Sequence, residues 1–180
     1  DLLGGGLSRY SVAPRWLVPH FEKMLYDNAL LSNLYLQAFL ITGQEFFQQI
    51  STEVLDFIQK ELRDPQGGFY SSLDADSEGQ EGKYYIWDLQ EIKSILEHDD
   101  LYQTAQAAFT LPVGGNFEGK IILRRQKTAQ EISDSLNLPL EKVQDRLQDI
   151  KNRLLEAREK RIRPGLDDKV LVAWNGLTLT

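Results

Sequence analysis

The feature that most constrains this chain is a helical stretch whose apolar residues fall on nearly every side. Residues 19–42 read as one long helix, and its second half, LLSNLYLQAFLI, is apolar around most of its circumference. Such a pattern is typical of a helix that is buried on both sides. Pro19 suits the first helical position, and Gly43 suits the residue that ends the helix. We therefore expect a fold in which this helix is surrounded by others.

The next helix, predicted over residues 44–63, has a different pattern. Its polar residues lie opposite a single apolar stripe, which predicts an outer helix with one face against the core. The stripe consists of Phe47, Ile50, Val54, Phe57, Ile58 and Leu62. A tight connection at Gly43 joins the two helices into an αα-hairpin with one inner and one outer member.

The segment that follows predicts a change from helix to strand. Aromatic-rich stretches at 67–74 and 82–88 flank the acidic turn ADSEGQE and favour a β-hairpin. Asp88 and Glu91 have the spacing of a capping box, which predicts a short helix ending near residue 96.

The last part of the chain predicts three more helices and a strand. A short helix is expected at 101–109, a strand within 114–125, and a long helix from about residue 140 to the Pro164–Gly165 stop. Asp167 or Asp168 can cap a final apolar helix, VLVAWNGLTLT. The sequence therefore predicts a mainly α fold with a small β-hairpin insertion.

Composition excludes several classes of function. The net charge of −7 and the pI of about 4.9 argue against a basic nucleic-acid-binding surface. The chain has no cysteine, so disulfides, thiolate metal sites and cysteine nucleophiles are excluded, and the redox compartment stays open. The longest apolar stretch is too short to span a bilayer, and no signal-peptide pattern opens the chain. We expect a cytoplasmic protein without nucleic-acid or membrane partners.

The glycine-rich segments do not indicate a nucleotide site. Residues 4–6 and 114–115 lack the strand–turn–helix setting and the lysine of a phosphate loop. We expect no cofactor and no metal ligand set in this chain.

Both ends of the sequence are expected to lie within a domain. The chain opens on DLLGGGLSRY and stops inside the apolar run AWNGLTLT, whereas natural domain termini usually lie in exposed polar segments. We therefore interpret residues 1–180 as part of one domain of a longer protein, truncated at both ends. Inner-helix faces would then be uncovered in the isolated chain, which we expect to self-associate.

Three polar clusters are predicted to meet at one end of this fold. In a ring of αα-hairpins, all inner helices start at the same end, where the outer helices finish. The clusters are residues 20–27, at the start of the first inner helix, the acidic loop 74–81, and residues 167–175, at the start of the last helix. We expect them to line a cleft at the mouth of the ring.

Carboxylates beside aromatic rings favour a carbohydrate site. Aromatic faces stack on sugar rings, and cleavage of a glycosidic bond needs one protonated and one ionised carboxyl. The candidate catalytic residues are His20, Asp74, Asp76 and Asp168. The candidate substrate-binding residues are Trp16, Glu22, Asp27, Tyr70, Glu78, Trp87, Trp174 and Asn175. Because sequence gives no distances between carboxyl groups, retaining and inverting chemistry both stay open.

Each candidate also has a purely structural interpretation. His20 can be hydrogen-bonded near a helix start, and Glu22 with Lys23 can form a solvated first turn or a local ion pair. The acids of 74–81 can be an ordinary hairpin turn. Their D-x-D-x-E-G run has some likeness to calcium loops, but its spacing does not match an EF-hand. Asp167 can be only a helix cap.

Four segments together resemble a known family. They are LGGGLSRYSVAPRWLVPHFEKMLYDNALL, GGFYSSLDADSEGQEGKYYIW, GGNFEGKIIL and RPGLDDKVLVAWNGL, in this order over almost the whole chain. The sequence resembles the spermatogenesis-associated and bacterial proteins in which a thioredoxin-like domain precedes a six-hairpin, glycosidase-like (α/α) barrel. The resemblance implies a fragment of an (α/α)6 toroid, related in fold to N-acylglucosamine epimerases and unsaturated-glucuronyl hydrolases. It implies a thioredoxin-like domain upstream and the remaining hairpins downstream.

Two functional hypotheses follow. The first is a carbohydrate-active barrel, a glycoside hydrolase or sugar epimerase, that uses carboxylates and a histidine at its mouth. The second is a noncatalytic module that binds a protein or a glycan and accompanies the thioredoxin-like domain. Loss of turnover on neutralising Asp74 and Asp76 would favour the first hypothesis.

Overall fold

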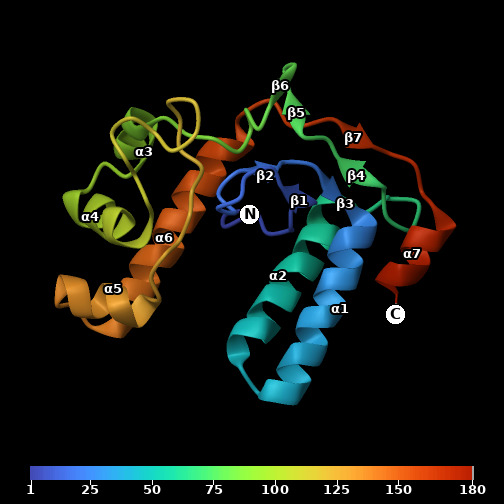
Figure 1. Cartoon of the computed structure of the whole chain (residues 1–180), viewed down its shortest axis with the longest axis horizontal. Coiled ribbons are helices and arrows are strands. Elements are labelled where there is room, and N and C mark those ends of the chain that lie inside the picture. Colours follow the sequence, from blue (N-terminus) through green and yellow to red (C-terminus); the bar gives the residue numbers. More distant parts are fainter. Residues whose placement is uncertain (180) are drawn as a thin grey trace. The chain divides into compact units, whose positions relative to one another are not determined.

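The computed structural model describes residues 1–179, and they are mainly helical (Figure 1). The helices are α1 (Leu25–Thr42), α2 (Glu45–Glu61), α3 (Leu89–Ile95), α4 (Asp99–Ala108), α5 (Ala129–Leu136), α6 (Leu140–Glu159) and α7 (Val172–Thr178). The strands are β1 (Tyr10–Ser11), β2 (Pro19–His20), β3 (Lys23–Met24), β4 (Ser72–Leu73), β5 (Asp76–Ser77), β6 (Gln80–Glu81) and β7 (Leu166–Asp167). Among the described residues, no helix is both long and apolar enough to cross a membrane.

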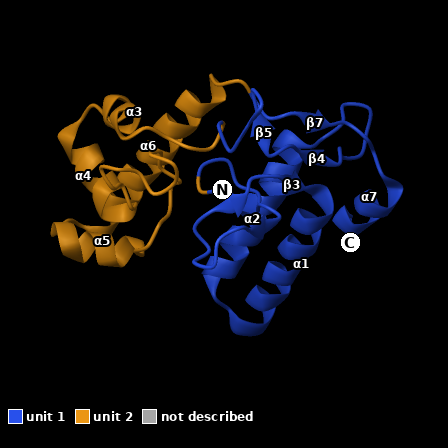
Figure 2. Ribbon diagram, turned by 45° about the horizontal axis from the view of Figure 1, so that its top comes forward, with its two compact units in different colours: residues 1, 3–83, 163–180 blue, residues 2, 84–162 orange. Residues whose placement is uncertain are grey.

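The chain divides into two compact units (Figure 2). Unit 1 contains Asp1, Leu3–Lys83 and the segment from Arg163 onward, and unit 2 contains Leu2 and Tyr84–Ile162. Unit 1 therefore holds α1, α2, α7 and the strands, and unit 2 holds α3 to α6.

The predicted αα-hairpin is confirmed in unit 1. Gly43 takes the left-handed conformation, with φ of 69°, and its N–H donates to the Phe39 carbonyl, which ends α1 as expected. Between the helices, Ser51 Oγ donates to the Ser32 carbonyl at 2.9 Å. The hairpin core consists of Leu25, Val54, Phe57, Ile58 and Leu62. The predicted stripe of α2 thus supplies most of this core.

The first helix differs from the prediction in its start. It begins at Leu25 and not at Pro19, because residues 19–20 and 23–24 form strands β2 and β3. The N–H of Leu25 donates to the Ser71 carbonyl at 2.8 Å, so the backbone is still paired with a neighbouring strand where the helix begins. The sequence pattern missed this because a two-residue strand leaves no period to detect.

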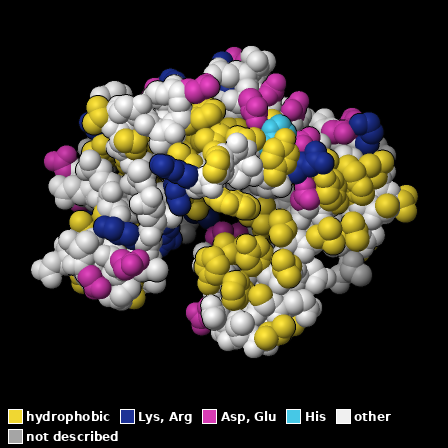
Figure 3. All heavy atoms as spheres, in the orientation of Figure 1, with side chains coloured by type: hydrophobic (Ala, Val, Ile, Leu, Met, Phe, Trp, Pro, Cys, Tyr) yellow, Lys and Arg dark blue, Asp and Glu magenta, His cyan; other side chains and the backbone are white. Residues whose placement is uncertain are grey.

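The prediction that α1 is buried on both sides is also not met within the described residues. The helix packs against α2 and α7, but several of its large apolar side chains face solvent. They are Leu30, Leu34, Leu36, Leu40 and Ile41. Apolar side chains accordingly gather on the visible surface of this hairpin (Figure 3).

A three-stranded antiparallel sheet joins three distant segments of unit 1. Strand β4 lies between β3 and β7, with Leu73 opposite both Lys23 and Leu166. Because β3 leads into α1 and β7 precedes α7, this sheet sets the starts of both helices. The two helices pack together through Tyr26 and Trp174, whose rings meet edge to face at 4.9 Å.

The predicted β-hairpin exists but is much shorter than expected. Strands β5 and β6 pair within the stretch predicted to be only a turn, and stretches 67–74 and 82–88 do not pair with each other. Glu78 and Gly79 form the two-residue loop with φ of 54° and 73°, the conformation of a type I′ turn. The twist of a type I′ turn matches the right-handed twist of the flanking strands, so the residues directly before and after the loop can pair.

Unit 2 confirms the predicted helices α3, α4 and α6. Asp88 and Glu91 form the capping box that opens α3. A further helix, α5, was not predicted; it is opened by a second capping box between Thr128 and Glu131. The strand expected within 114–125 is present only as isolated bridges, such as Trp87 with Ile121. Ala108, Ile132 and Val143 form a core cluster of this unit.

Candidate functional site

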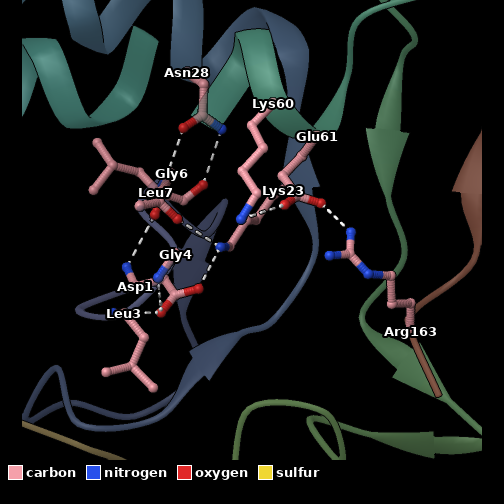
Figure 4. Close-up of polar contacts among 11 residues, drawn as sticks. Asp1, Leu3, Gly4, Gly6, Leu7, Lys23, Asn28, Lys60, Glu61 and Arg163 are labelled. Atoms are coloured by element: carbon pink, nitrogen blue, oxygen red, sulfur yellow. Dashed lines mark hydrogen bonds and ion pairs between the residues drawn. The ribbon is translucent and has the colours of Figure 1, made fainter. Parts of the chain in front are cut away.

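The polar residues of segment 19–28 divide into a buried set and a partly exposed set. Lys23 belongs to the buried set, with a side chain that is 3% exposed. Its ammonium donates to Asp1 Oδ2 at 2.8 Å and to the Gly5 carbonyl at 2.7 Å (Figure 4). It also lies 4.7 Å from the centre of the Phe57 ring. The expectation of a solvated turn or a local ion pair is therefore wrong for Lys23, because its partners come from the N-terminal loop.

That loop owes its glycines to a close approach to α2. Gly5 and Gly6 both have φ of 71°, and a Cβ on Gly6 would lie 2.6 Å from the Phe57 ring. Only glycine fits both the conformation and the space. Gly5 and Gly6 thus support packing, and the Gly5 carbonyl also accepts a hydrogen bond from Lys23.

Asn28 is the second buried residue of the segment, and it has an equivalent in α7. Its Oδ1 accepts from the Leu7 N–H at 2.7 Å, and its Nδ2 donates to the carbonyls of Leu7 and Met24. Asn175 repeats this pattern: Oδ1 accepts from the Phe69 N–H at 2.7 Å, and Nδ2 donates to the carbonyls of Phe69 and Leu171.

Both asparagines therefore clip an extended segment onto a helix. Each lies four residues after the residue that caps its helix, Met24 for α1 and Leu171 for α7. Both Nδ2 hydrogens of Asn175 are used by backbone carbonyls, so the side chain predicted to bind substrate has a structural task here.

The partly exposed set forms what we call the His20 cluster, defined by Arg9, His20, Glu22, Asp27 and Glu81. His20 Nδ1 lies 2.8 Å from Glu81 Oε1, and its Nε2 lies 3.6 Å from Glu22 Oε2. Arg9 Nη1 lies 3.4 Å from the same oxygen of Glu22. The structure therefore brings the first polar segment and the acidic hairpin together, as predicted.

Asp27 is the most perturbed carboxyl of the cluster. Its Oδ2 is buried and has no hydrogen-bond partner among the described residues. Burial raises the pKa of Asp27; the charge of Arg9 lowers it, the charge of Glu22 raises it, and a hydrogen bond with Tyr26 lowers it. The net shift is upward, so the neutral acid persists to higher pH than in an ordinary aspartate.

Asp74 directly follows β4 of the three-stranded sheet, and Asp76 lies in β5, opposite Glu81 of β6. The N–H of Asp74 donates to the Gly165 carbonyl at 2.8 Å, which extends the pairing of β4 and β7 by one residue. In the same register, Glu22 falls opposite Asp74 on the β3 side. Asp74 Oδ1 accepts from the Asp76 N–H at 3.3 Å and so helps to shape the loop before β5.

Glu78 lies at the turn of the β5–β6 hairpin and pairs with Lys83 at 2.8 Å. Acidic side chains gather around this hairpin on the visible face (Figure 3). The Phe21 ring holds the hairpin base, where a Cβ on Gly82 would collide with it. No group of three His, Asp or Glu among residues 1–179 is arranged to hold a metal ion.

The third predicted cluster joins the sheet through β7, but neither aspartate caps α7. The N-cap residue is Leu171, and Asp167 instead pairs with Lys169 at 2.7 Å, which lowers the pKa of Asp167. Asp168 is exposed and lies close enough to Tyr70 for its charge to act on that phenol. Burial first, then Asp64 and Asp168, raise the pKa of Tyr70, whose hydroxyl lies 3.2 Å from Asp64 Oδ1.

The three tryptophans have different environments. Trp16 is 81% exposed at the tip of the β1–β2 connection, with φ of 53°. Trp174 packs on Tyr26, as described above. Trp87 is 1% exposed and belongs to unit 2, where the Arg161 guanidinium lies 4.0 Å from its ring centre. A buried indole offers no face to a sugar, so Trp87 is placed in a core and not at a site.

Sequence reasoning missed Arg9 and underrated Glu81. Arg9 is aligned with the cluster by pairing between residues 9–11 and 19–22, where the Arg9 N–H donates to the Glu22 carbonyl at 3.0 Å. Tyr10 stacks on His20, with ring centres 4.8 Å apart. The sequence signal that could have indicated this pairing is the short run between two prolines. The chain segments on either side of such a run can form an antiparallel pair.

The structure thus defines a mainly helical chain in which a small sheet gathers acids, a histidine and an arginine at the start of α1. Over its whole length the chain is similar to spermatogenesis-associated protein 20 of Rattus norvegicus and of Homo sapiens, at 34% identity in each case. It is also 28% identical to an uncharacterized protein of Caenorhabditis elegans. The chain spans about a quarter of the length of these relatives, 26% for the rat protein. No family model matches the chain.

Proposed function

We propose that this chain contributes an acid/base centre to a carbohydrate-active domain of a longer protein. The observation that carries the proposal is Asp27, a carboxyl with a buried, unpartnered oxygen and a raised pKa, close to Glu22. Glu22 lies beside Arg9 and His20 at 3.4 and 3.6 Å. A carboxyl whose pKa is raised thus lies near a second carboxyl that is paired with the Arg9 guanidinium, and general acid and base catalysis requires two groups of such different proton affinity.

In this proposal, Asp27 gives its proton to the departing or ring oxygen of a sugar. Glu22 accepts a proton from the attacking water or from the sugar carbon. His20 and Glu81 hold Glu22 and the acidic hairpin in place, and Asp74 adds a further carboxylate from the neighbouring strand. Asp76 and Asp168 remain predicted catalytic residues, and Tyr70, Glu78 and Trp174 remain predicted substrate contacts.

The architecture that we propose for the complete domain is a six-hairpin (α/α) toroid behind a thioredoxin-like domain. The αα-hairpin of α1 and α2, the exposed apolar side of α1 and the repeated asparagine clip on α7 support a repeating helical arrangement. The family resemblance supports the thioredoxin-like neighbour, and we propose a cytoplasmic location for the whole protein.

The test uses the full-length protein and a panel of oligosaccharides, with product analysis for new reducing ends and for inverted stereocentres. We expect Asp27→Asn and Glu22→Gln to lower kcat by about 100-fold or more, the usual contribution of a positioned acid or base. Asp56→Asn, at an exposed carboxylate on α2, is the matched control and should keep full activity. Because Asp27 acts as the proton donor, activity should fall as the pH rises through its raised pKa.

The opposing hypothesis, a noncatalytic glycan- or protein-binding module, predicts a different result. If the protein binds oligosaccharides without turnover, and Asp27→Asn binds them equally well, the acid/base centre is rejected and a binding module is supported. Turnover that survives both carboxyl substitutions would reject the assignment of these two residues.

A further inference from the structure

The connection between β1 and β2 carries a feature that folding alone does not explain. Trp16, near the middle of residues 12–18, has φ of 53° and is 81% exposed. A bulky side chain rarely adopts that backbone conformation, which is strained for residues other than glycine. Because the indole is exposed, its burial contributes little stability to offset the backbone strain at Trp16. The position therefore combines a strained backbone with an exposed aromatic ring.

This connection is nevertheless a defined structure. Ser11 Oγ donates to the carbonyl of Ala13 at 2.8 Å and lies 3.3 Å from that of Val18, and the Val12 N–H donates to Val18 at 2.9 Å. The Trp16 N–H donates to the Ala13 carbonyl at 3.1 Å. These bonds close the loop at its base and fix the backbone from which the indole projects.

The base of the loop is built into the His20 cluster. Tyr10, the first residue of β1, stacks on His20 of β2, and Arg9 lies beside Glu22. Only two residues separate Trp16 from Pro19, the first residue of β2. Trp16 therefore belongs to the same β1–β2 hairpin that carries Arg9 and His20 of the cluster.

We propose that Trp16 is a stacking platform for a sugar ring of the ligand whose reacting part lies at the His20 cluster. The inference rests on the proposed function and adds an extended, oligomeric substrate to it. Sugar rings present a C–H face that packs on the flat face of an aromatic side chain, and an indole is the largest such face in proteins. A rigid loop suits this role because little side-chain freedom is lost on binding.

The experiment measures oligosaccharide binding to the full-length protein by calorimetry, with cello-, chito- and malto-tetraose as probes. We expect Trp16→Ala to weaken binding of the bound tetraose about tenfold, the order of one aromatic contact, and Trp16→Phe to restore most of it. Val12→Ala, at an exposed apolar residue of the same loop, should leave binding unchanged. Trp16→Gly should weaken binding while raising the melting temperature, because glycine relieves the positive φ.

The outcomes separate this inference from the proposed function. If the tetraose binds Trp16→Ala as tightly as it binds the wild type, the platform is rejected while the acid/base centre can still stand. If Trp16→Ala lowers the free energy of unfolding by as much as it lowers the binding free energy, the platform is also rejected, because the role of the indole would then be structural. If Trp16→Ala instead abolishes binding to anionic phospholipid vesicles, the ring is a membrane contact. Failure of the wild type to bind any tetraose rejects the proposed function and this inference together.

Discussion

At the scale of single residues, the polar groups of segment 19–28 have two opposed effects on stability. Lys23 and Asn28 are buried and hydrogen-bonded, and they hold the N-terminal loop against β3 and α1. Asp27, one residue before Asn28, has a buried oxygen with no partner among the described residues. Apart from the Met24 carbonyl, the partners of these two residues come from positions more than 15 residues away, so sequence spacing predicted the chemistry of the segment but not its pairing.

Removing an asparagine clip should cost considerable stability. Asn28→Ala deletes three hydrogen bonds and leaves the Leu7 N–H and carbonyl without their partner, so we expect a loss of about 3 kcal/mol in the free energy of unfolding. Urea denaturation measures this. Asn33→Ala, at an exposed position of the same helix, is the control and should change little. Equal effects of the two substitutions would show that the clip contributes nothing.

Removing the charge of Asp27 should have the opposite effect. Burial raises its pKa in the folded state, so the folded chain keeps a proton at pH values where the unfolded chain has lost it. Stability therefore falls as the pH rises from about 4, the ordinary carboxyl value, through the raised pKa. Asp27→Asn lacks this titration, and we expect it to be more stable than the wild type at pH 7.

Melting temperatures between pH 3.5 and 8 would check this prediction. The advantage of Asp27→Asn should shrink as the pH is lowered, and Asp56→Asn, at an exposed carboxylate, is the control variant. A variant that is less stable than the wild type at every pH would mean that the carboxylate is stabilised by its neighbours.

At the scale of elements, helices were predictable and strands were not. The stripe of α2, the Gly43 stop and the Asp88–Glu91 capping box all repeat or pair within a few residues, so the sequence alone specifies them. Strands β3, β4 and β7 are two residues long and pair across gaps of about 50 and 90 residues. Their pairing depends on tertiary packing, which short-range patterns do not record.

Substitutions at two glycines with nearly equal φ angles can distinguish the cost of backbone strain from the cost of close packing. Gly6 and Gly79 have φ of 71° and 73°, but only a Cβ on Gly6 would meet the Phe57 ring, at 2.6 Å. We expect Gly79→Ala to cost about 1 kcal/mol through backbone strain alone. Gly6→Ala should cost about 3 kcal/mol, because it also overpacks the core. Thermal unfolding compares the two, and equal losses would contradict the close approach.

At the scale of the whole molecule, the described chain consists of two compact units, each with its own core cluster. In unit 1 the αα-hairpin agrees with expectation, whereas the three-stranded sheet was not predicted. Of the polar segments, the first contacts the acidic hairpin through His20 and Glu81. The ring itself was inferred from resemblance and stays a proposal. The exposed apolar side chains of α1 and α7 are the feature that the isolated chain leaves uncovered.

These surfaces predict self-association of the 180-residue chain. Leu34, Ile41 and Val172 are 62%, 83% and 88% exposed, and apolar patches of this kind seek partners. Sedimentation should show dimers or larger species at micromolar concentration. Replacing Leu34 and Ile41 by glutamate should shift the chain toward monomer, whereas the paired change Asn33→Glu and Gln37→Glu, on exposed polar positions, should not. A monomeric wild type would refute the prediction.

Because of the two asparagine clips, the exchange rates of two backbone amides report separately on the local opening of α1 and of α7. The amide of Leu7 is protected by Asn28 on α1, and that of Phe69 by Asn175 on α7. In a deuterium-exchange experiment, each amide proton exchanges when its hydrogen bond to the asparagine of its own helix opens. The difference between their rates therefore reads out whether the two helices loosen as one body or independently.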